Sequence, residues 1–421
     1  MFPGTRRGAY LALGFLMNLM LGTAYAWSVF TKPLIRSYGA TDFTSMLPLA
    51  VALAMFSVGM VFAGRLVDRH GPRKVAVLGG ILVGTGYLLS AGVHLTPWPM
   101  AGLTLTYGVV VGLGLGFAYN PPIPTAVRWF PDRKGLASGL VVMGFGLSAL
   151  FMAPLADTLI AAYGVPATFL LLGVLFLAVL VSAGALLAFP PADWKAPEAK
   201  ATSRRTWSPQ AEVDSRTMVR SPTFWIAWAL YVLGTAGGFM VIGKAKPIAE
   251  EIGLATGLLA IAAVQVLAVF NSLGRPVFGR AADVFGPRRT LLMMNLVLLG
   301  AMALLAASAG FGGSALVPLY SGIALTGMVF GGFLAAMPAL ATYYFGAKHL
   351  GSNYGLLFTG YGLGAIVALF AIGPLRMAFG TYLPAFYVGI LLSLLGLVLS
   401  LQVRPPRPAA ARAARAKPTK A

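Results

Sequence analysis

Arg275 is the residue whose type and position point most clearly to a binding role, because it lies inside an apolar stretch, residues 254–276. A guanidinium at membrane depth is costly, and such a residue usually faces a cavity or a partner. None of the eleven Asp and Glu residues is clearly inside an apolar stretch. A buried arginine without a carboxylate partner suits an anion, and its planar fork can bind a carboxylate through two hydrogen bonds. Snorkelling towards Arg280, five residues further on, is the alternative.

Other polar side chains can line a site around this arginine. Asn271 is four residues before Arg275, on the same face of a helix, and its amide can add a hydrogen bond to an anion. Tyr119 and Asn120 directly precede two consecutive prolines. Paired prolines remove backbone donors and distort a helix, which frees carbonyls that need a polar or wet setting. We therefore expect Tyr119 and Asn120 to face a cavity, with a plain packing kink as the alternative.

Catalytic and metal-binding chemistry has no support in the residue types. Cysteine is absent, which excludes disulfides, thiol chemistry and cysteine-ligated metals. The three histidines, His70, His94 and His349, lie in separate polar connections. No nucleophile–base or metal constellation remains on which an enzyme could rest. We expect no enzymatic activity and no cofactor.

The composition identifies the elements that must position these residues. Hydrophobic residues make up 58% of the 421 residues and charged residues 10%, against about 25% charged in an average soluble chain. A membrane helix needs about 20 mainly apolar residues. The sequence therefore predicts an all-α membrane protein with twelve transmembrane helices. The apolar stretches lie near 9–31, 44–64, 75–93, 98–122, 135–156, 165–189, 223–243, 254–276, 290–310, 316–340, 352–373 and 382–402.

The net charge of +20 could indicate a nucleic-acid binder, but the positions of the cations indicate a membrane topology. With the N-terminus inside, 25 of the 31 Lys and Arg residues fall in inside segments and five in outside loops. Because cytoplasmic loops carry the excess of Lys and Arg, both termini are predicted to be cytoplasmic. We expect no nucleic-acid partner, and we expect an integral protein of the cell (inner) membrane in contact with lipid.

An internal repeat divides the chain. The segment from Gly64 to Lys74 matches the segment from Gly279 to Arg289 at an offset of 215 residues. Each half then has six spans in one orientation, as in transporters with parallel repeats that alternate access about a central site. The predicted domains are an N-terminal six-helix bundle, a cytoplasmic linker, a C-terminal six-helix bundle and a disordered basic cytoplasmic tail. Their residues are 1–189, 190–222, 223–403 and 404–421.

The repeated loop resembles the signature loop of the major facilitator superfamily. This resemblance implies the twelve-helix fold of that superfamily over residues 8 to 403. The loop contains two aspartates that can pair with arginine or cap a helix N-terminus, and breaking such contacts would open an inner gate. A short hairpin with topology-setting charges is the plainer alternative. The predicted gating residues are Gly64, Asp68, Arg73, Gly279, Asp283 and Arg288.

Two further segments narrow the resemblance. Residues 21–30 resemble helix 1 of the oxalate/formate antiporter family, and residues 129–140 are similar to a loop that this family shares with the monocarboxylate transporters. In both groups a helix 8 arginine binds the carboxylate, and Arg275 sits at that place. The oxalate carrier adds a lysine in helix 11, whereas the matching region here, Thr359 to Tyr361, has none. One intramembrane cation therefore favours a monocarboxylate.

These features predict a proton-coupled symporter of small monocarboxylates such as lactate or pyruvate, acting as a monomer by alternating access. Arg275 would bind the carboxylate, Asn271, Tyr119, Asn120 and Tyr361 would shape the site, and Phe330 would form an apolar wall or serve packing alone. The first alternative is an oxalate/formate-type anion exchanger, since without a buried acid beside Arg275 the site would need another anion in order to reorient. The second is a membrane sensor or assembly subunit on a transporter fold, which a fold alone does not exclude.

Overall fold

The computed structural model describes residues 3–191, 193–194, 212–242, 244–252, 258–308 and 315–405, and every regular element in them is a helix. Most of the predicted linker, residues 195–211, and the tail from residue 406 onwards lie outside the described residues. The predicted disorder of the tail and the domain boundaries therefore stay predictions.

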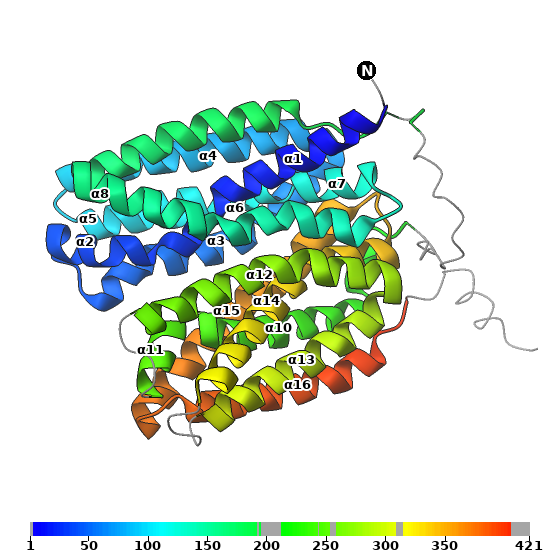
Figure 1. Ribbon diagram of the computed structural model, residues 1–421. Coiled ribbons are helices and arrows are strands. Elements are labelled where there is room, and N and C mark those ends of the chain that lie inside the picture. Colours follow the sequence, from blue (N-terminus) through cyan, green and yellow to red (C-terminus); the bar gives the residue numbers. More distant parts are fainter. Residues whose placement is uncertain are drawn as a thin grey trace, which may run out of the picture.

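The N-terminal half forms one bundle, drawn from blue to green in Figure 1. Its long helices are interrupted by short irregular segments at the places where glycine and proline occur. The elements are α1 (Pro3–Leu21), η1 (Gly22–Ala26), α2 (Ser28–Tyr38), α3 (Asp42–His70), α4 (Pro72–Ala91), η2 (Val93–Leu95), α5 (Pro99–Leu103), η3 (Thr104–Val111), α6 (Gly112–Tyr119), α7 (Pro122–Trp129) and α8 (Lys134–Leu186).

The C-terminal half forms a second bundle beside the first (Figure 1). Its elements are α9 (Ser215–Val219), α10 (Pro222–Ile242), α11 (Ala245–Glu251), α12 (Leu258–Phe285), α13 (Pro287–Ser308), α14 (Leu316–Phe345), α15 (Leu350–Phe379) and α16 (Leu383–Gln402). The described ends of the chain lie on the same side of the molecule in Figure 1. We call this side, which carries the α3–α4, α7–α8, α12–α13 and α14–α15 turns, the terminal face.

The helices provide the twelve predicted crossings. Within the part of the chain that the structure describes, ten helical stretches are long and apolar enough to span a membrane. One of these, α8, has 53 residues and would extend about 80 Å as a straight helix, far more than a bilayer thickness. It bends at Gly164, whose φ of 79° no straight helix allows, and so makes two crossings. The twelfth is α12, the helix of 28 residues that contains Arg275.

The break between α6 and α7 has a direct cause in the sequence. Helix α6 ends at Tyr119 and α7 begins at Pro122, so Asn120 and Pro121 form the interruption. A proline has no amide hydrogen to donate to the preceding turn, and its ring clashes with the carbonyl four residues earlier. The predicted distortion of this helix is therefore present, and it places Tyr119 and Asn120 at the end of a helical segment.

The bundles meet through helix pairs that approach at glycine. Helix α3 packs on α15, and α8 packs on α12. A side chain on Gly64 would overlap the Gly351 carbonyl, and one on Gly135 would overlap the Gly279 carbonyl. Both contacts lie on the terminal face, next to the repeated loops. The closest approach of the two backbones therefore coincides with the predicted gating residues.

The close packing of α12 on α14 leaves no room for a side chain at Gly331. A Cβ atom there would overlap the carbonyl oxygen of Asn271, whereas a Cβ atom on Gly300 would meet nothing within 4 Å. We expect Gly331→Ala to lower the unfolding free energy by about 1–3 kcal/mol, the usual cost of overpacking. Gly300→Ala is the matched control and should be neutral or slightly stabilising, since alanine favours helix. Equal melting temperatures of the two purified variants would contradict the close contact.

Candidate functional site

Arg275 occupies the interface between the bundles at the middle of the packing of α12 on α8. Its side chain is fully buried. One terminal nitrogen, Nη1, donates to the Val142 carbonyl of the opposite bundle, and the other, Nη2, donates to Asn271 Oδ1 at 3.3 Å. The guanidinium thus points across the interface instead of towards the terminal face. This geometry favours a site residue over a snorkelling one.

The positive charge of Arg275 is met only by neutral groups. Among the described residues it forms no ion pair, and its Nε atom has no hydrogen-bond partner. Carbonyl and amide dipoles offset part of the desolvation cost of a buried cation, but a carboxylate would offset more. Among the described residues the positive charge of Arg275 is therefore not balanced by a negative one, and its Nε atom remains as a hydrogen-bond donor for an anion.

Aromatic side chains from both bundles surround the arginine. The Tyr25 hydroxyl lies 3.2 Å from the Tyr361 hydroxyl, which joins η1 to α15. The guanidinium carbon of Arg275 lies 5.8 Å from the Phe145 ring centre, and the Tyr119 ring packs edge-on against Phe145 at 5.4 Å. Further rings in this group are Phe56, Tyr231, Tyr354 and Phe358.

The predicted site residues fall into two places. Asn271 contacts Arg275, and Tyr119 and Tyr361 belong to the aromatic group around it. Phe330 packs 6.1 Å from Tyr361, at the edge of this group. Asn120 lies elsewhere, because its amide donates to the Gly351 carbonyl at 3.2 Å across the two bundles. Asn120 therefore belongs with the gating residues by position.

The carbonyl oxygen of Asn271 accepts a hydrogen bond from Arg275, so Asn271 holds the guanidinium. Donation from its NH2 group to an anion stays a prediction. Sequence reasoning missed Tyr25, Phe145 and Val142. For Tyr25 the sequence offered one signal, its place within residues 21–30, which resemble a known helix 1. The Val142 contact is made by a backbone carbonyl, so the type of side chain at that position could not predict it.

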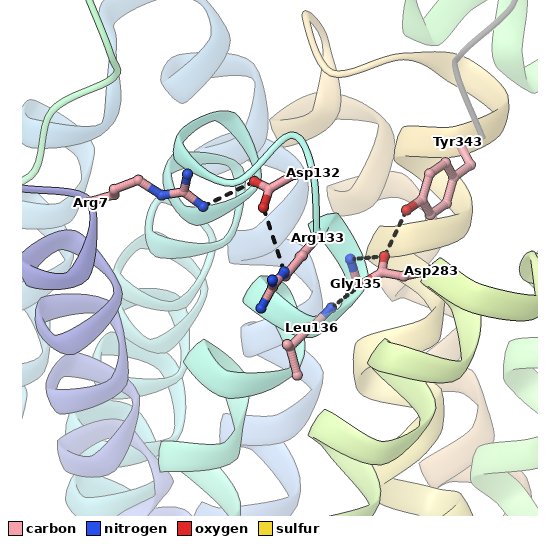
Figure 2. A network of polar contacts seen from close by, with 7 residues as sticks. All are labelled: Arg7, Asp132, Arg133, Gly135, Leu136, Asp283 and Tyr343. Carbon is pink, nitrogen blue, oxygen red and sulfur yellow. Dashed lines mark hydrogen bonds and ion pairs between the residues drawn. The ribbon is translucent and has the colours of Figure 1, made fainter. Parts of the chain in front are cut away.

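Two aspartates join the bundles at the terminal face. Asp68, at the end of α3, accepts hydrogen bonds from the backbone amides of Gly351 and Ser352 at 3.1 and 2.7 Å. Asp283, at the end of α12, accepts them from Gly135 and Leu136 at 2.7 and 2.9 Å (Figure 2). The two contacts are related by the internal repeat. Each aspartate therefore binds the start of a helix in the opposite bundle.

These aspartates act as helix N-caps supplied from outside the helix. The residues that precede α15 and α8, His349 and Arg133, make no side-chain capping hydrogen bond. The first amides of a helix lack partners within it, and the positive end of the helix dipole favours a carboxylate. Asp68 and Asp283 meet both needs, but only while the two bundles are together at the terminal face.

The remaining predicted gating residues differ in their contacts. Gly64 and Gly279 lie at the close backbone approach, as described above. Arg73 and Arg288 are exposed at the starts of α4 and α13, and neither pairs with these aspartates among the described residues. Asp283 additionally accepts a hydrogen bond from the Tyr343 hydroxyl at 2.7 Å (Figure 2). The partners of the two carboxylates are thus backbone amides and a phenol instead of arginines.

The chain belongs to the Major Facilitator Superfamily, whose family model matches residues 11–270 and 237–421. This superfamily consists of transporters, not enzymes, and its members are integral membrane proteins. The chain is 30% identical over 355 residues to the uncharacterized MFS-type transporter YhjX of Escherichia coli, with 83% of this chain and 84% of that protein covered. It is 28% identical to the oxalate:formate antiporter of Oxalobacter formigenes, with 86% and 85% covered.

A third relative and a solved structure complete the comparison. The chain is 32% identical to human monocarboxylate transporter 11 over 282 residues, which cover 65% of this chain and 55% of that protein. The crystal structure of the superfamily transporter FucP in the outward conformation has the same fold, with a TM-score of 0.70 at 16% identity. The match covers 94% of this chain and all of that one. The predicted twelve-helix fold of the superfamily is therefore confirmed.

The capping geometry predicts how Asp68 controls the terminal face. In Asp68→Asn an amide oxygen can accept one hydrogen bond, but the charge that favours the helix N-terminus is lost. We expect the ratio of open to closed bundles at this face to rise about tenfold, which corresponds to about 1.4 kcal/mol. Spin labels at Lys74→Cys and Arg289→Cys, both exposed, report the distance between bundles by electron–electron resonance. The control is Asp157→Asn, an exposed position on α8, and an unchanged distance distribution in Asp68→Asn refutes the capping role.

Proposed function

We propose that this protein is a proton-coupled symporter of small monocarboxylates, such as lactate or pyruvate. The single observation that carries the proposal is the fully buried Arg275, which has a free Nε donor and no acidic partner among the described residues. One unbalanced cation suits one negative charge. Relatives named as an oxalate:formate antiporter and as a monocarboxylate transporter support a small carboxylate as the substrate class.

The residues around Arg275 suggest how a carboxylate binds. The guanidinium presents its free Nε, and its Nη1 is bound to a neutral carbonyl, that of Val142, which a charged oxygen can replace with a gain in energy. Asn271 keeps the guanidinium in place from the same helix. Tyr25, Tyr119 and Tyr361 offer hydroxyls to the carboxylate or to a hydroxyl or keto group beside it. The surrounding rings limit the substrate to a few carbon atoms.

The terminal face is the cytoplasmic side in this proposal, because the connections on it carry most of the Lys and Arg residues. Both termini are then cytoplasmic, and the membrane is the cell (inner) membrane. The caps made by Asp68 and Asp283, together with Gly64, Gly279 and Asn120, close the cytoplasmic side. A role of Arg73 and Arg288 in this gate stays a prediction, because neither pairs with the two aspartates among the described residues. Substrate then enters from the far side, and separation of the bundles at the terminal face releases it.

An anion exchanger of the oxalate/formate type is the second candidate, and a specific observation favours it. Arg275 has no acidic partner among the described residues, so movement of the bundles around this cation without an accompanying anion is costly. In an exchanger, a returning anion removes that cost. A symporter must instead return with Arg275 held by Val142 and Asn271 alone, as the structure shows it.

Substitution of Arg275 tests the binding role. We expect Arg275→Gln to lower uptake of labelled lactate into proteoliposomes by about 100-fold or more, since at least one charged hydrogen bond and the site's cation are lost. Arg275→Lys keeps the charge but loses the fork, so it should retain only a small part of the activity. The control is Arg36→Gln, an exposed position on α2, which should transport normally. Normal uptake in Arg275→Gln excludes carboxylate binding at this site.

The two transport modes differ in what drives uptake. For a symporter, an outside-acidic pH gradient should raise the initial rate of lactate uptake several-fold, and the internal solution need not contain substrate. For an exchanger, uptake should require internal oxalate, formate or lactate and should ignore the pH gradient. Empty vesicles with and without the gradient, compared with vesicles preloaded at equal pH, separate the two. Uptake only into preloaded vesicles rules out the symporter.

A further inference from the structure

The turn between α14 and α15, residues Gly346–His349, is held from outside by two charged side chains. It begins at Gly346, whose φ of 89° is in the left-handed region. The amides of Ala347 and Lys348 donate to the two carboxylate oxygens of Glu212 at 3.3 and 2.8 Å. Glu212 lies in the described end of the linker, before α9. The linker therefore satisfies the free amides of a turn in the C-terminal bundle.

The N-terminal bundle binds the carbonyls of the same turn. Arg128, at the end of α7, donates through Nη2 to the carbonyl oxygens of Ala347 and Lys348 at 3.3 and 2.8 Å. Its guanidinium also stacks 3.8 Å above the Phe189 ring, which restricts its position. Two adjacent residues, Ala347 and Lys348, thus have their amides bound by the linker and their carbonyls bound by the N-terminal bundle. Arg128 and Glu212 also attract each other electrostatically.

Neighbouring contacts extend this attachment into the first turn of α15. The Val213 amide donates to the Phe345 carbonyl at 2.8 Å, and the buried Asn353 donates through its side chain to the Val213 carbonyl at 2.9 Å. The Ser215 hydroxyl donates to Asn353 Oδ1 at 2.9 Å. Asn353 directly follows the two amides that Asp68 caps. The linker is therefore attached beside the gate contact made by Asp68.

The other half of the molecule holds its corresponding turn differently. There the turn between α7 and α8 contains Asp132, which pairs with Arg7 of α1 at 3.0 Å and lies 3.6 Å from Arg133 (Figure 2). That ion pair lies within the N-terminal bundle. The contact through Glu212 and Arg128 instead connects the linker, the turn and the opposite bundle. The two gate contacts are thus related by the repeat, but their supports are not.

We propose that Glu212 is a positioning residue of the gate: it holds the Gly346–His349 turn in the shape that Arg128 binds, so that attachment of the linker stabilises the closed terminal face. Without this carboxylate the two amides lose their acceptor, the turn can rotate, and Arg128 loses one or both carbonyls. The N-terminus of α15 that Asp68 caps is then less well placed. The proposal rests on the alternating access of the proposed function, but its test needs no substrate.

The test measures the distance between the bundles in the full-length protein, with spin labels at Lys74→Cys and Arg289→Cys. The chain contains no native cysteine, so the labels report from these two positions only. We expect Glu212→Ala to raise the ratio of open to closed bundles about fivefold, since two partly exposed charge-assisted hydrogen bonds are lost. Glu212→Gln, which keeps one acceptor oxygen, should have a smaller effect. An unchanged ratio in Glu212→Ala, with a raised ratio in Asp68→Asn, overturns the proposal.

A double variant shows whether Glu212 acts through Arg128. If both side chains serve one turn, Glu212→Ala should add little to the ratio already raised by Arg128→Gln, because coupled residues are not additive. A full additional fivefold increase overturns this part of the proposal. Glu250→Ala is the matched control, since Glu250 is an exposed glutamate that pairs with Lys246 at 3.7 Å far from this turn. A failure of lactate uptake in the parent protein would challenge the proposed function but would leave these distance measurements intact.

Discussion

The contact between two helix N-termini and two carboxylates is the constraint on which this structure depends. The first amides of a helix need acceptors, and α15 and α8 obtain theirs from Asp68 and Asp283 of the opposite bundles. These carboxylates can reach because Gly64 and Gly279 let the backbones approach closely. Separation of the bundles must therefore rehydrate four amides and two carboxylates together. Because these groups lose their partners together, the closed terminal face is a distinct conformational state and not one of many partly open ones.

Arg275 connects this closed face to the centre of the protein. It belongs to α12, the helix that carries Asp283 in its last turn, and it binds α8, the helix that Asp283 caps. One helix pair therefore carries both the buried cation and a gate contact. Any anion that changes how Arg275 binds Val142 must also change how strongly α12 and α8 hold together. Occupancy of the site and the position of the bundles are then linked by differential binding energy, as a carrier requires.

Apolar length and the internal repeat were sufficient to predict the twelve helices and to single out the two aspartates, because both signals can be read directly from the order of residues. Capping of a helix N-terminus was one of the two roles predicted for these aspartates, but the helix that each one caps was not predictable, since it belongs to the other bundle. The contact between Tyr25 and Tyr361 joins residues that are 336 positions apart in the sequence, and helix periodicity predicts only contacts between residues a few positions apart. Asn120 was expected at the cavity with Tyr119 because two prolines follow them, whereas in the structure the Asn120 amide donates to the Gly351 carbonyl of the opposite bundle.

The use of backbone amides as hydrogen-bond donors to the aspartates has a consequence for the evolution of this interface. Any residue except proline supplies an amide at the start of a helix, so Leu136 and Ser352 donate to the aspartates from equivalent positions in spite of their different side chains. The other two amides belong to Gly135 and Gly351, where a side chain would meet the opposite bundle. The aspartates have no substitute of equal charge and length. At Leu136 and Ser352 a substitution therefore needs no matching change at the aspartate, although each contact joins the two halves of the molecule.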